Sequence, residues 1–493
     1  MLSVVVFGPL AVGLVLLALP RLPDPAVRWT WVAASAADLA LVVALWIRYD
    51  PRAGIGYEAN VPWIPTVSSA YHIGVDGLSL PLLAMTAVLF LACAVYSLRQ
   101  KERVRAYTVL FLLLQTVSLG LFVSLDLILF FVFFDVSIVA MYFVIAGWGH
   151  GERARRSALM FFLYTFLGSL VLLLGFIGLY LAGGTFDIVE LAAAAPLDGR
   201  GPLAGLVLLA LVVGLAVKTP TVPFHTWLPP AHTDAPAVGS AILAGVLLKM
   251  GTYGFVRIVL PIMPETWRQY AWVIVVVGVV SVIYGALVAL AQTDLKRMIA
   301  YTSVNHMGYV ILAVGAAGLV AGSSEQARTL AVTGAVTQMV SHGLITGALF
   351  LLTGVLYARG GTYEMAAYGG LAGPAPRFAL LFAAAAFASL GLPGFSGFIA
   401  EFQIFAGSLD GAPVPTVIAV FGVVLTAALF LIALHRVFLG PTRAPGATGD
   451  VTAVEASAIA PLVLLIVVIG VFPRFLLDVI EPAARAVAEL VAR

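Results

Sequence analysis

Four ionisable side chains of this sequence lie inside apolar stretches, where a charge is costly. In membrane-spanning segments such residues are rare, and they mark ion or proton pathways. A charge at the centre of a membrane costs about 2.5–3.5 kcal/mol on insertion scales. The chemistry that these residue types favour is proton transfer. They are Asp135 in FFVFFDVSIV, Lys218 in GLAVKTP, Lys249 in GVLLKMG and Glu401 in GFIAEF.

Asp135 and Lys218 are candidates for an interacting pair. Asp135 follows Asp126, which begins the helix, by nine residues, and therefore lies about 13–14 Å deep at 1.5 Å per residue. Burial disfavours the charged form of Lys218, whereas a nearby carboxylate favours it. Two other interpretations remain open at this stage. Asp135 could be protonated and bonded to a neighbouring helix, or the pair could be a static salt bridge that only fixes helix packing.

Four histidines add groups that can both donate and accept a proton near neutral pH. His306 and His342 lie within apolar segments, and Gln338 precedes His342 by one helical turn. His225 and His232 flank a proline-rich segment and are candidates for proton uptake. The alternative for each histidine is a hydrogen-bonded side chain that only packs helices. No pair has the spacing, with convergent carboxylates, that a metal site requires.

The composition places these residues in a membrane. Of 493 residues, 62% are hydrophobic and 10% are charged, and the mean hydropathy is +1.08. A soluble domain would carry about 25% charged residues. Nucleic-acid binding is excluded because no basic patch is interleaved with aromatics. The single cysteine, Cys93, excludes disulfides and thiolate-ligated metal or iron–sulfur centres within the chain.

Apolar windows of roughly 20 residues predict an all-α polytopic membrane protein with about 14 transmembrane helices. No stretch is typical of a separate soluble domain, and the connections are short except for 49–76 and the segment around 183–201. The expected helices cover 3–20, 28–48, 77–98, 106–124, 126–148, 157–182, 203–230, 236–260, 270–292, 297–319, 328–357, 376–408, 413–439 and 453–477.

Prolines interrupt two of the expected helices. Pro220 and Pro223 break the seventh helix, and Pro393 breaks the twelfth. A break at membrane depth survives only where other groups satisfy the freed backbone. The breaks are five helices apart, and paired breaks at that spacing indicate two inverted five-helix repeats around a midplane site. The chain then divides into 1–105 with the first three helices and a loop, a first repeat at 106–260, a second repeat at 261–440, and a last helix and tail at 441–493.

The loop charges predict an orientation. Most lysines and arginines, with Lys296 counted among them, fall in loops on the side opposite the two termini. Because basic loops stay in the cytoplasm, both termini are expected outside it. The clusters SLRQKERVR and GERARR are interpreted as topology anchors without a further function.

Several long motifs resemble the antiporter-like membrane subunits of complex I, the proton-pumping NADH:quinone oxidoreductase. Glutamate at the position of Glu401, and an end soon after the fourteenth helix, are similar to the M-type chain. The L-type and N-type chains and the large Mrp antiporter subunits typically carry lysine there. The motifs, which span about residues 71–408, are YHIGVDGLSLPL, MYFVIAGWGH, KTPTVPFHTWLPPAHTDAPAVGS, GVLLKMGTYG, DLKRMIAYTSVNHMGYV, QMVSHGLITGALFLLTGVLY and ASLGLPGFSGFIAEF.

The resemblance implies roles for the buried residues. Asp135 and Lys218 would be a coupled pair, Lys249 the central relay and Glu401 the terminal group. The connecting hydrophilic axis would include His306 and His342.

Two departures from the family pattern bear on these roles. The family usually has glutamate at the position of Asp135, and WLPPAH replaces WLPDAH, so that Pro230 removes a carboxylate. Aspartate is one methylene shorter than glutamate. The gap between Asp135 and Lys218 must therefore be closed by the backbone, another rotamer or water.

The resemblance also implies partners and a location. NADH, FMN, iron–sulfur clusters and quinone would bind to other subunits, and no cofactor or metal is expected in this chain. L-type and N-type chains would flank it in the plasma membrane of a bacterial cell. Two other functions remain open. One is a subunit of an Mrp-type cation/proton antiporter, and the other is a structural spacer whose polar residues only hold helices together.

Overall fold

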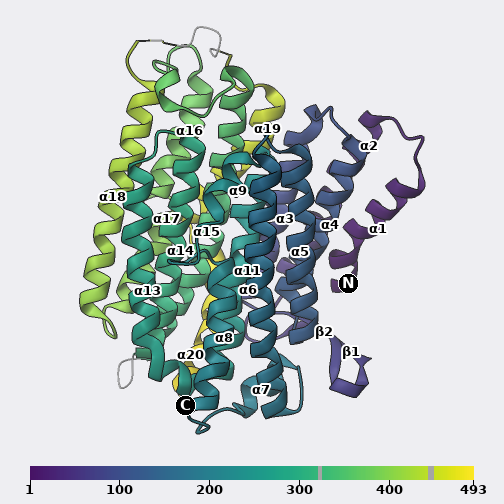
Figure 1. The fold of residues 1–493 in the computed structure, drawn as a ribbon, viewed down its shortest axis with the longest axis vertical. Helices are drawn as coiled ribbons and strands as arrows, with labels where there is room; N and C mark the ends of the chain where they lie inside the picture. Colours follow the sequence, from purple (N-terminus) through teal and green to yellow (C-terminus); the bar gives the residue numbers. More distant parts are fainter. Residues whose placement is uncertain (320–324, 442, 444–448, 493) are drawn as a thin grey trace.

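Long helices that run roughly parallel form the body of the molecule (Figure 1). The computed structural model describes residues 1–319, 325–441, 443 and 449–492. In this part of the chain, ten helices are long and apolar enough to span a membrane, and three shorter apolar helices accompany them. The predicted helical, polytopic architecture is confirmed at this level. The number of about 14 spans and the inverted repeats stay predictions.

The first half of the chain follows the expected helix ranges closely. The eighth expected helix is a composite of α-helical and π-helical segments. The elements are α1 (Leu2–Ala18), α2 (Asp24–Arg48), α3 (Ser79–Tyr96), α4 (Val104–Val123), α5 (Leu127–Trp148), α6 (Ala154–Gly183), α7 (Ile188–Ala194), α8 (Pro202–Lys218), α9 (Leu228–Asp234), α10 (Ala237–Ile242), η3 (Leu243–Leu247), α11 (Leu248–Gly254), η4 (Phe255–Val259) and α12 (Leu260–Ile262).

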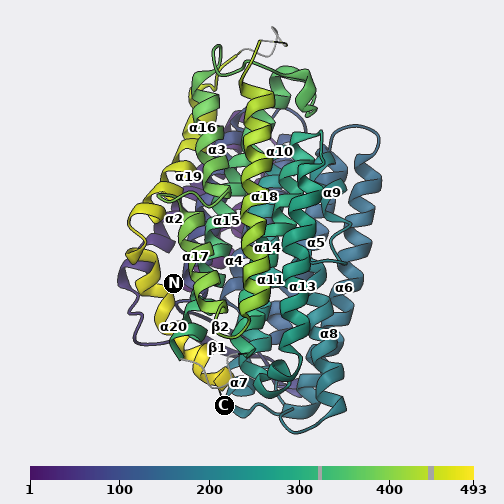
Figure 2. The same ribbon diagram turned by 90° about the vertical axis from the view of Figure 1, so that its left-hand side faces the viewer.

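The second half packs against the first along the length of the bundle (Figures 1 and 2). Its longest helix, α15, lies at the centre, with 94% of its apolar window buried. The elements are α13 (Pro264–Leu290), α14 (Leu295–Leu319), α15 (Glu325–Gly360), α16 (Pro376–Ser389), α17 (Ser396–Ser408), α18 (Pro413–Phe438), α19 (Ala453–Val471) and α20 (Arg474–Ala492).

Both predicted helix breaks are confirmed. α8 ends at Lys218 and the chain becomes helical again only at α9, and α16 and α17 are separated in the same way. The first break is held by hydrogen bonds that replace helical ones. Trp227 Nε1 donates to the Val217 carbonyl at 3.0 Å, and the Val222 amide donates to Ser281 Oγ at 3.0 Å. Buried backbone groups freed by a break need such partners.

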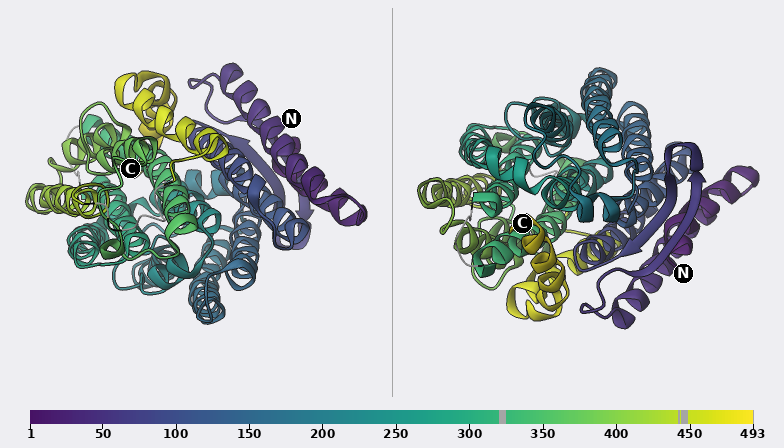
Figure 3. Two further views of the ribbon diagram at one scale, coloured as in Figure 1. Left: turned by 90° about the horizontal axis from the view of Figure 1, so that it is seen from above. Right: turned by 90° about the horizontal axis from the view of Figure 1, so that it is seen from below.

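The expectation of a wholly α-helical chain is wrong at 49–76, which was expected to be a loop. Strands β1 (Gly56–Ile64) and β2 (Ser69–Val75) form an antiparallel hairpin there. The hairpin runs along the edge of the bundle, next to α1 when the molecule is seen end-on (Figure 3). Because its strands are short and partly polar, windows chosen to find membrane spans do not detect them.

His72 fastens this hairpin to the loops around it. Its ring is buried, with Nδ1 2.5 Å from Asp187 Oδ2 and Nε2 2.8 Å from Glu58 Oε1. Burial lowers the pKa of His72, but the two carboxylates outweigh burial and raise it above its ordinary value. Asp126 adds a second attachment: it caps α5 and accepts hydrogen bonds from Ser69 Oγ and the Ala70 amide.

The last helix also differs from its predicted range. The expected helix 453–477 ends at Val471, and a separate helix, α20, begins at Arg474. In α20, apolar residues recur on one face and charged residues on the other, which is typical of a helix at an interface. Its average hydropathy is therefore too low for a window that detects membrane spans. Figure 2 shows α20 along the lower flank of the bundle, ending near α7.

Glycines bring α13 and α14 into backbone contact. A Cβ atom on Gly308 would lie 2.7 Å from the Val282 amide nitrogen, and one on Gly278 would lie 2.6 Å from the Leu312 amide nitrogen. Small residues permit this close approach, which is a common way for membrane helices to associate.

We expect Gly308→Ala to destabilise the protein by about 1–3 kcal/mol, because the added methyl group overpacks a backbone contact. Gly8→Ala is the matched control, since Gly8 is also helical but a Cβ there meets nothing within 4 Å. Thermal unfolding of the detergent-solubilised protein measures both. Equal melting temperatures for the two variants would contradict the packing that the structure describes.

Candidate functional site

Lys249 lies in the most deeply buried span of the protein. The whole apolar window of residues 237–262 is inside the molecule, and π-helical segments η3 and η4 flank the helical turn that carries this lysine. Its side chain is 0% exposed. Lys249 Nζ donates to the carbonyl of Ala244, which belongs to η3. Single π-helical turns of this kind are frequent at functional sites.

The second contact of Lys249 leads to the histidines of the second half. Lys249 Nζ lies 2.6 Å from His342 Nδ1 on α15. The ring of His342 in turn packs against that of His306 on α14, with 5.4 Å between the centroids. Both rings are buried, at 2% and 3% exposure. A lysine and two histidines from three different helices therefore follow one another in space.

The series ends at Glu401. His306 Nδ1 lies 3.6 Å from Glu401 Oε1, and both side chains are buried. The other nitrogen of this ring, Nε2, is held by Ser389 Oγ at 3.0 Å. Gln338 Nε2 also approaches His306 Nδ1, at 3.3 Å. A small cavity lies among these residues and His342.

The break in the twelfth expected helix gives Glu401 its space. Gly391 has a φ of +75°, a left-handed conformation that favours glycine. A Cβ atom on Gly391 would collide with Glu401 Oε2. Ser396, at the start of α17, forms a hydrogen bond of 2.7 Å with Ser341 of α15, which holds the break against α15. The proline and glycine break thus lets the carboxylate lie against the backbone.

Asp135 and Lys218 are neighbours but not a direct ion pair. Both belong to the described part of the chain, where no contact within 4 Å joins their charged atoms. Lys218 Nζ donates to Ser137 Oγ at 3.0 Å and lies over the Phe134 ring at 4.8 Å. Asp135 is half-buried, next to Ser169, and its Oδ1 has no hydrogen-bond partner. The two charges still interact electrostatically.

His232 and His225 occupy different surroundings. His232 is 0% exposed and stacks on Phe350 at 4.6 Å, with both ring nitrogens unpartnered in the structure. His225 contacts Tyr284 edge to face at 4.9 Å. The described residues contain no group of three or more histidines, cysteines or carboxylates that could hold a metal ion.

Lys296 is a buried ionisable residue that the sequence analysis placed in a loop. It was counted as a loop residue that sets topology, yet its side chain is 0% exposed at the start of α14. Lys296 Nζ donates to the Ala235 carbonyl at 2.5 Å and lies 3.4 Å from Tyr363 Oη. It also acts electrostatically on His232, as Lys249 does. The use of lysine could have indicated that Lys296 is buried. Lys218 and Lys249 are buried lysines in a chain whose loops use mainly arginine.

Comparisons with known proteins agree along almost the whole chain. Residues 124–426 match the family described as NADH:quinone oxidoreductase/Mrp antiporter, TM. The chain is 39% identical to NADH-quinone oxidoreductase subunit M of Rhodobacter capsulatus, over 98% of this chain and 95% of that protein.

Solved structures give the same result. The structure of respiratory complex I from Thermus thermophilus with bound NADH contains a similar chain, with a TM-score of 0.89, 30% identity and full coverage of both chains. The Mrp complex from Dietzia sp. DQ12-45-1b contains a chain of the same fold, with a TM-score of 0.88 and 23% identity over 100% of this chain and 99% of that one.

We expect Gly391→Ala to change the protonation equilibrium of Glu401, because the new methyl group displaces the carboxylate from the backbone. Gly394→Ala is the control, since Gly394 also has positive φ but a Cβ there meets nothing within 4 Å. Infrared spectroscopy over a pH series measures the protonated carboxyl band, which Glu401→Gln identifies. Identical titrations in both alanine variants would contradict the contact.

Proposed function

Because this chain belongs to the family of transmembrane subunits shared by NADH:quinone oxidoreductases and Mrp antiporters, we propose that it is a proton-translocating subunit of the M type. The observation that carries this proposal is the buried series Lys249–His342–His306–Glu401, which links both halves of the molecule. The cofactors of such an oxidoreductase sit in other subunits. This chain contributes the path and not the redox chemistry.

The series can pass a proton in steps between neighbouring side chains, of which Lys249 and His342 are already at hydrogen-bond distance. Lys249 Nζ faces His342 Nδ1 at 2.6 Å, so a proton can pass between the amine and the imidazole. The next step is from the His342 ring to the adjacent His306 ring. From His306 Nδ1 the proton reaches Glu401, 3.6 Å away, after a small approach of the two groups. Each group in this series can both bind and release a proton.

Gln338 gives the middle of the series two alternative states. His306 Nδ1 accepts from Gln338 Nε2 only while that ring nitrogen carries no proton. Once protonated, the same nitrogen donates instead to Glu401 Oε1. The protonation state of one ring thereby selects between an amide and a carboxylate partner. This is a two-state element of the kind that coupling requires.

Asp135 and Lys218 supply the coupling to the rest of the complex. A charged Asp135 that moves closer to Lys218 stabilises its ammonium, and separation favours release of the proton toward Lys249. The helices that carry Lys218 and Lys249, α8 and α11, are already in contact. A Cβ on Gly251 of α11 would lie 2.8 Å from the Leu215 carbonyl of α8. Ser137 holds Lys218 in the separated arrangement. The shorter aspartate therefore needs a movement of α5 or α8, or a water, to complete the pair.

Lys296 extends the path to the N-terminal end of α14. It lies within electrostatic reach of Asp234 and Asp294, two half-buried carboxylates, as well as of His232. A proton taken up by these carboxylates can pass through Lys296 and His232 to Lys249. His225, at the other end of the break, remains a second candidate for proton uptake.

The arrangement in the membrane follows from the same features. We assign 106–260 and 261–440 to two inverted repeats, supported by a first break that begins just after Lys218 and a second break that ends shortly before Glu401. The loops on the side opposite the termini carry more lysines and arginines. Because such loops stay in the cytoplasm, both termini lie outside the cytoplasm of a bacterial cell. L-type and N-type chains flank this subunit. The likeness to an Mrp chain at 23% identity extends to the fold alone and does not favour antiport.

We expect Lys249→Ala to reduce proton translocation by the assembled complex by roughly tenfold or more, because it removes the group that links the two halves. Lys101→Ala is the matched control, since Lys101 is an exposed loop lysine. NADH-driven acidification of proteoliposomes, measured with quinone reduction, gives the readout. A spacer role would instead lower the amount of assembled complex and leave translocation per complex unchanged, and that result would refute the proposal.

A further inference from the structure

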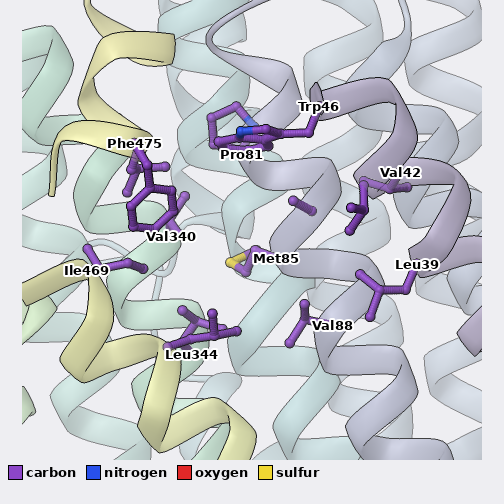
Figure 4. A pocket seen from close by; sticks show the side chains of 14 residues that line it. Leu39, Val42, Trp46, Pro81, Met85, Val88, Val340, Leu344, Ile469 and Phe475 are labelled. Carbon is purple, nitrogen blue, oxygen red and sulfur yellow. The ribbon is translucent and has the colours of Figure 1, made fainter. Parts of the chain in front are cut away.

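An apolar cavity of about 250 Å³ lies beside α15, whose Val340 and Leu344 help to line it (Figure 4). Five helices border it: α2, α3, α15, α19 and the start of α20. None of the proton-path residues lines it. The side chains that line it include Val42, Met85, Val88, Leu344 and Ile469.

The cavity is elongated along the helices and open at its side. Its lining runs from Leu39 to Trp46 on α2 and from Pro81 to Val88 on α3, a length of about 10 Å at 1.5 Å per residue. Val43 and Phe475, which also line it, are 46% and 43% exposed. An apolar channel of this length that runs parallel to membrane helices and opens at its side fits an alkyl chain.

A polar pocket adjoins the end of this channel. Arg474 lines the polar pocket and Phe475 lines the channel, and Asp50 follows Trp46 by four residues. The pocket contains equal numbers of cations and anions, on α20 and on the loop after α2. They are Arg52, Arg474 and Arg485, with Asp50, Asp478 and Glu481.

We propose that the two cavities together bind one phospholipid with an ethanolamine headgroup. An acyl chain fills the apolar channel, the phosphate binds Arg52 and Arg474, and the ammonium binds Asp478 or Glu481. Arg474 and Asp478 lie 3.9 Å apart, so neither charge is tightly engaged. A zwitterionic headgroup satisfies both signs of charge, whereas an anionic lipid without an amine offers its phosphate to the arginines and no cation to the carboxylates.

The amphipathic helix α20 supports this orientation. Its charged face carries the headgroup residues while Leu476 on its other face lines the channel. Such a helix lies at the boundary between headgroups and acyl chains. The bound chain would pack against Val340 and Leu344, on the side of α15 away from His342.

Photolabelling of the assembled complex tests the apolar part of the site. The probe is phosphatidylethanolamine with a diazirine on one acyl chain, and peptides that contain Met85 or Leu344 are analysed by mass spectrometry. We expect Val88→Trp to reduce labelling about tenfold, because excluding even two buried CH₂ groups weakens binding to that extent. Val424→Trp is the control, on a side chain that is 63% exposed on α18. If Val88→Trp prevents assembly, Ile469→Phe replaces it.

The headgroup part is tested with phosphatidylglycerol that carries the same diazirine. We expect it to label the same peptides severalfold less, and the double variant Arg474→Gln, Asp478→Asn to abolish this difference. Equal labelling by both lipids would overturn the headgroup assignment. Labelling that Val88→Trp leaves unchanged, or that added ubiquinone competes with while unlabelled phosphatidylethanolamine does not, would overturn the lipid site.

Discussion

The buried Lys249 amine has to find its hydrogen-bond partners inside the protein, and much of the structure follows from this requirement. With 0% exposure it has no access to solvent, so the π-helical turn offers the Ala244 carbonyl and α15 offers His342. An unpaired buried amine would cost several kcal/mol. Because one of the two partners is a titratable histidine and not a second carbonyl, the contact that satisfies the amine can also transfer a proton.

The same principle applies to His306, His342 and Glu401, which lie on α14, α15 and α17. Two of the buried groups have polar neighbours on other helices: His306 with Ser389 and Gln338, and Lys218 with Ser137. In a low-dielectric interior, such networks fix the relative position of helices as strongly as packing does. A change in the protonation of one group therefore alters the stability of the hydrogen bonds of its neighbours. A redox-driven movement in other subunits can use this dependence to move protons.

The spans and their breaks could be predicted from the sequence because they rest on strong local signals. Apolar runs of membrane length and the prolines at 220, 223 and 393 leave few other structures possible. The hairpin of β1 and β2 and the amphipathic α20 escaped prediction. In both, polar and apolar residues are mixed along the sequence, so that the average hydropathy of a window is only moderate. The π-helical segments beside Lys249 also escaped prediction.

For the site, residue types could be predicted and contacts could not. Intramembrane charge alone singled out Lys249 and Glu401, but which histidine bonds which residue depends on the relative rotation of three helices. The Asp135–Lys218 distance also lay beyond the sequence, which predicts a pair but not that Ser137 intervenes. Lys296 was assigned to a loop because the polar residues at the start of α14 have low hydropathy, as loop residues do. In the structure the Lys296 side chain is completely buried.

The central claim is that a proton on Lys249 and the protonation of Glu401 depend on each other through the two histidines. Redox-triggered infrared difference spectroscopy of the assembled complex measures it directly, with the Glu401 carboxyl band as the signal. The account predicts that NADH-driven turnover changes this band in the natural protein and that His342→Leu, which removes the link, abolishes the change while leaving the band itself in place. A full redox-triggered change in the His342→Leu complex would contradict it.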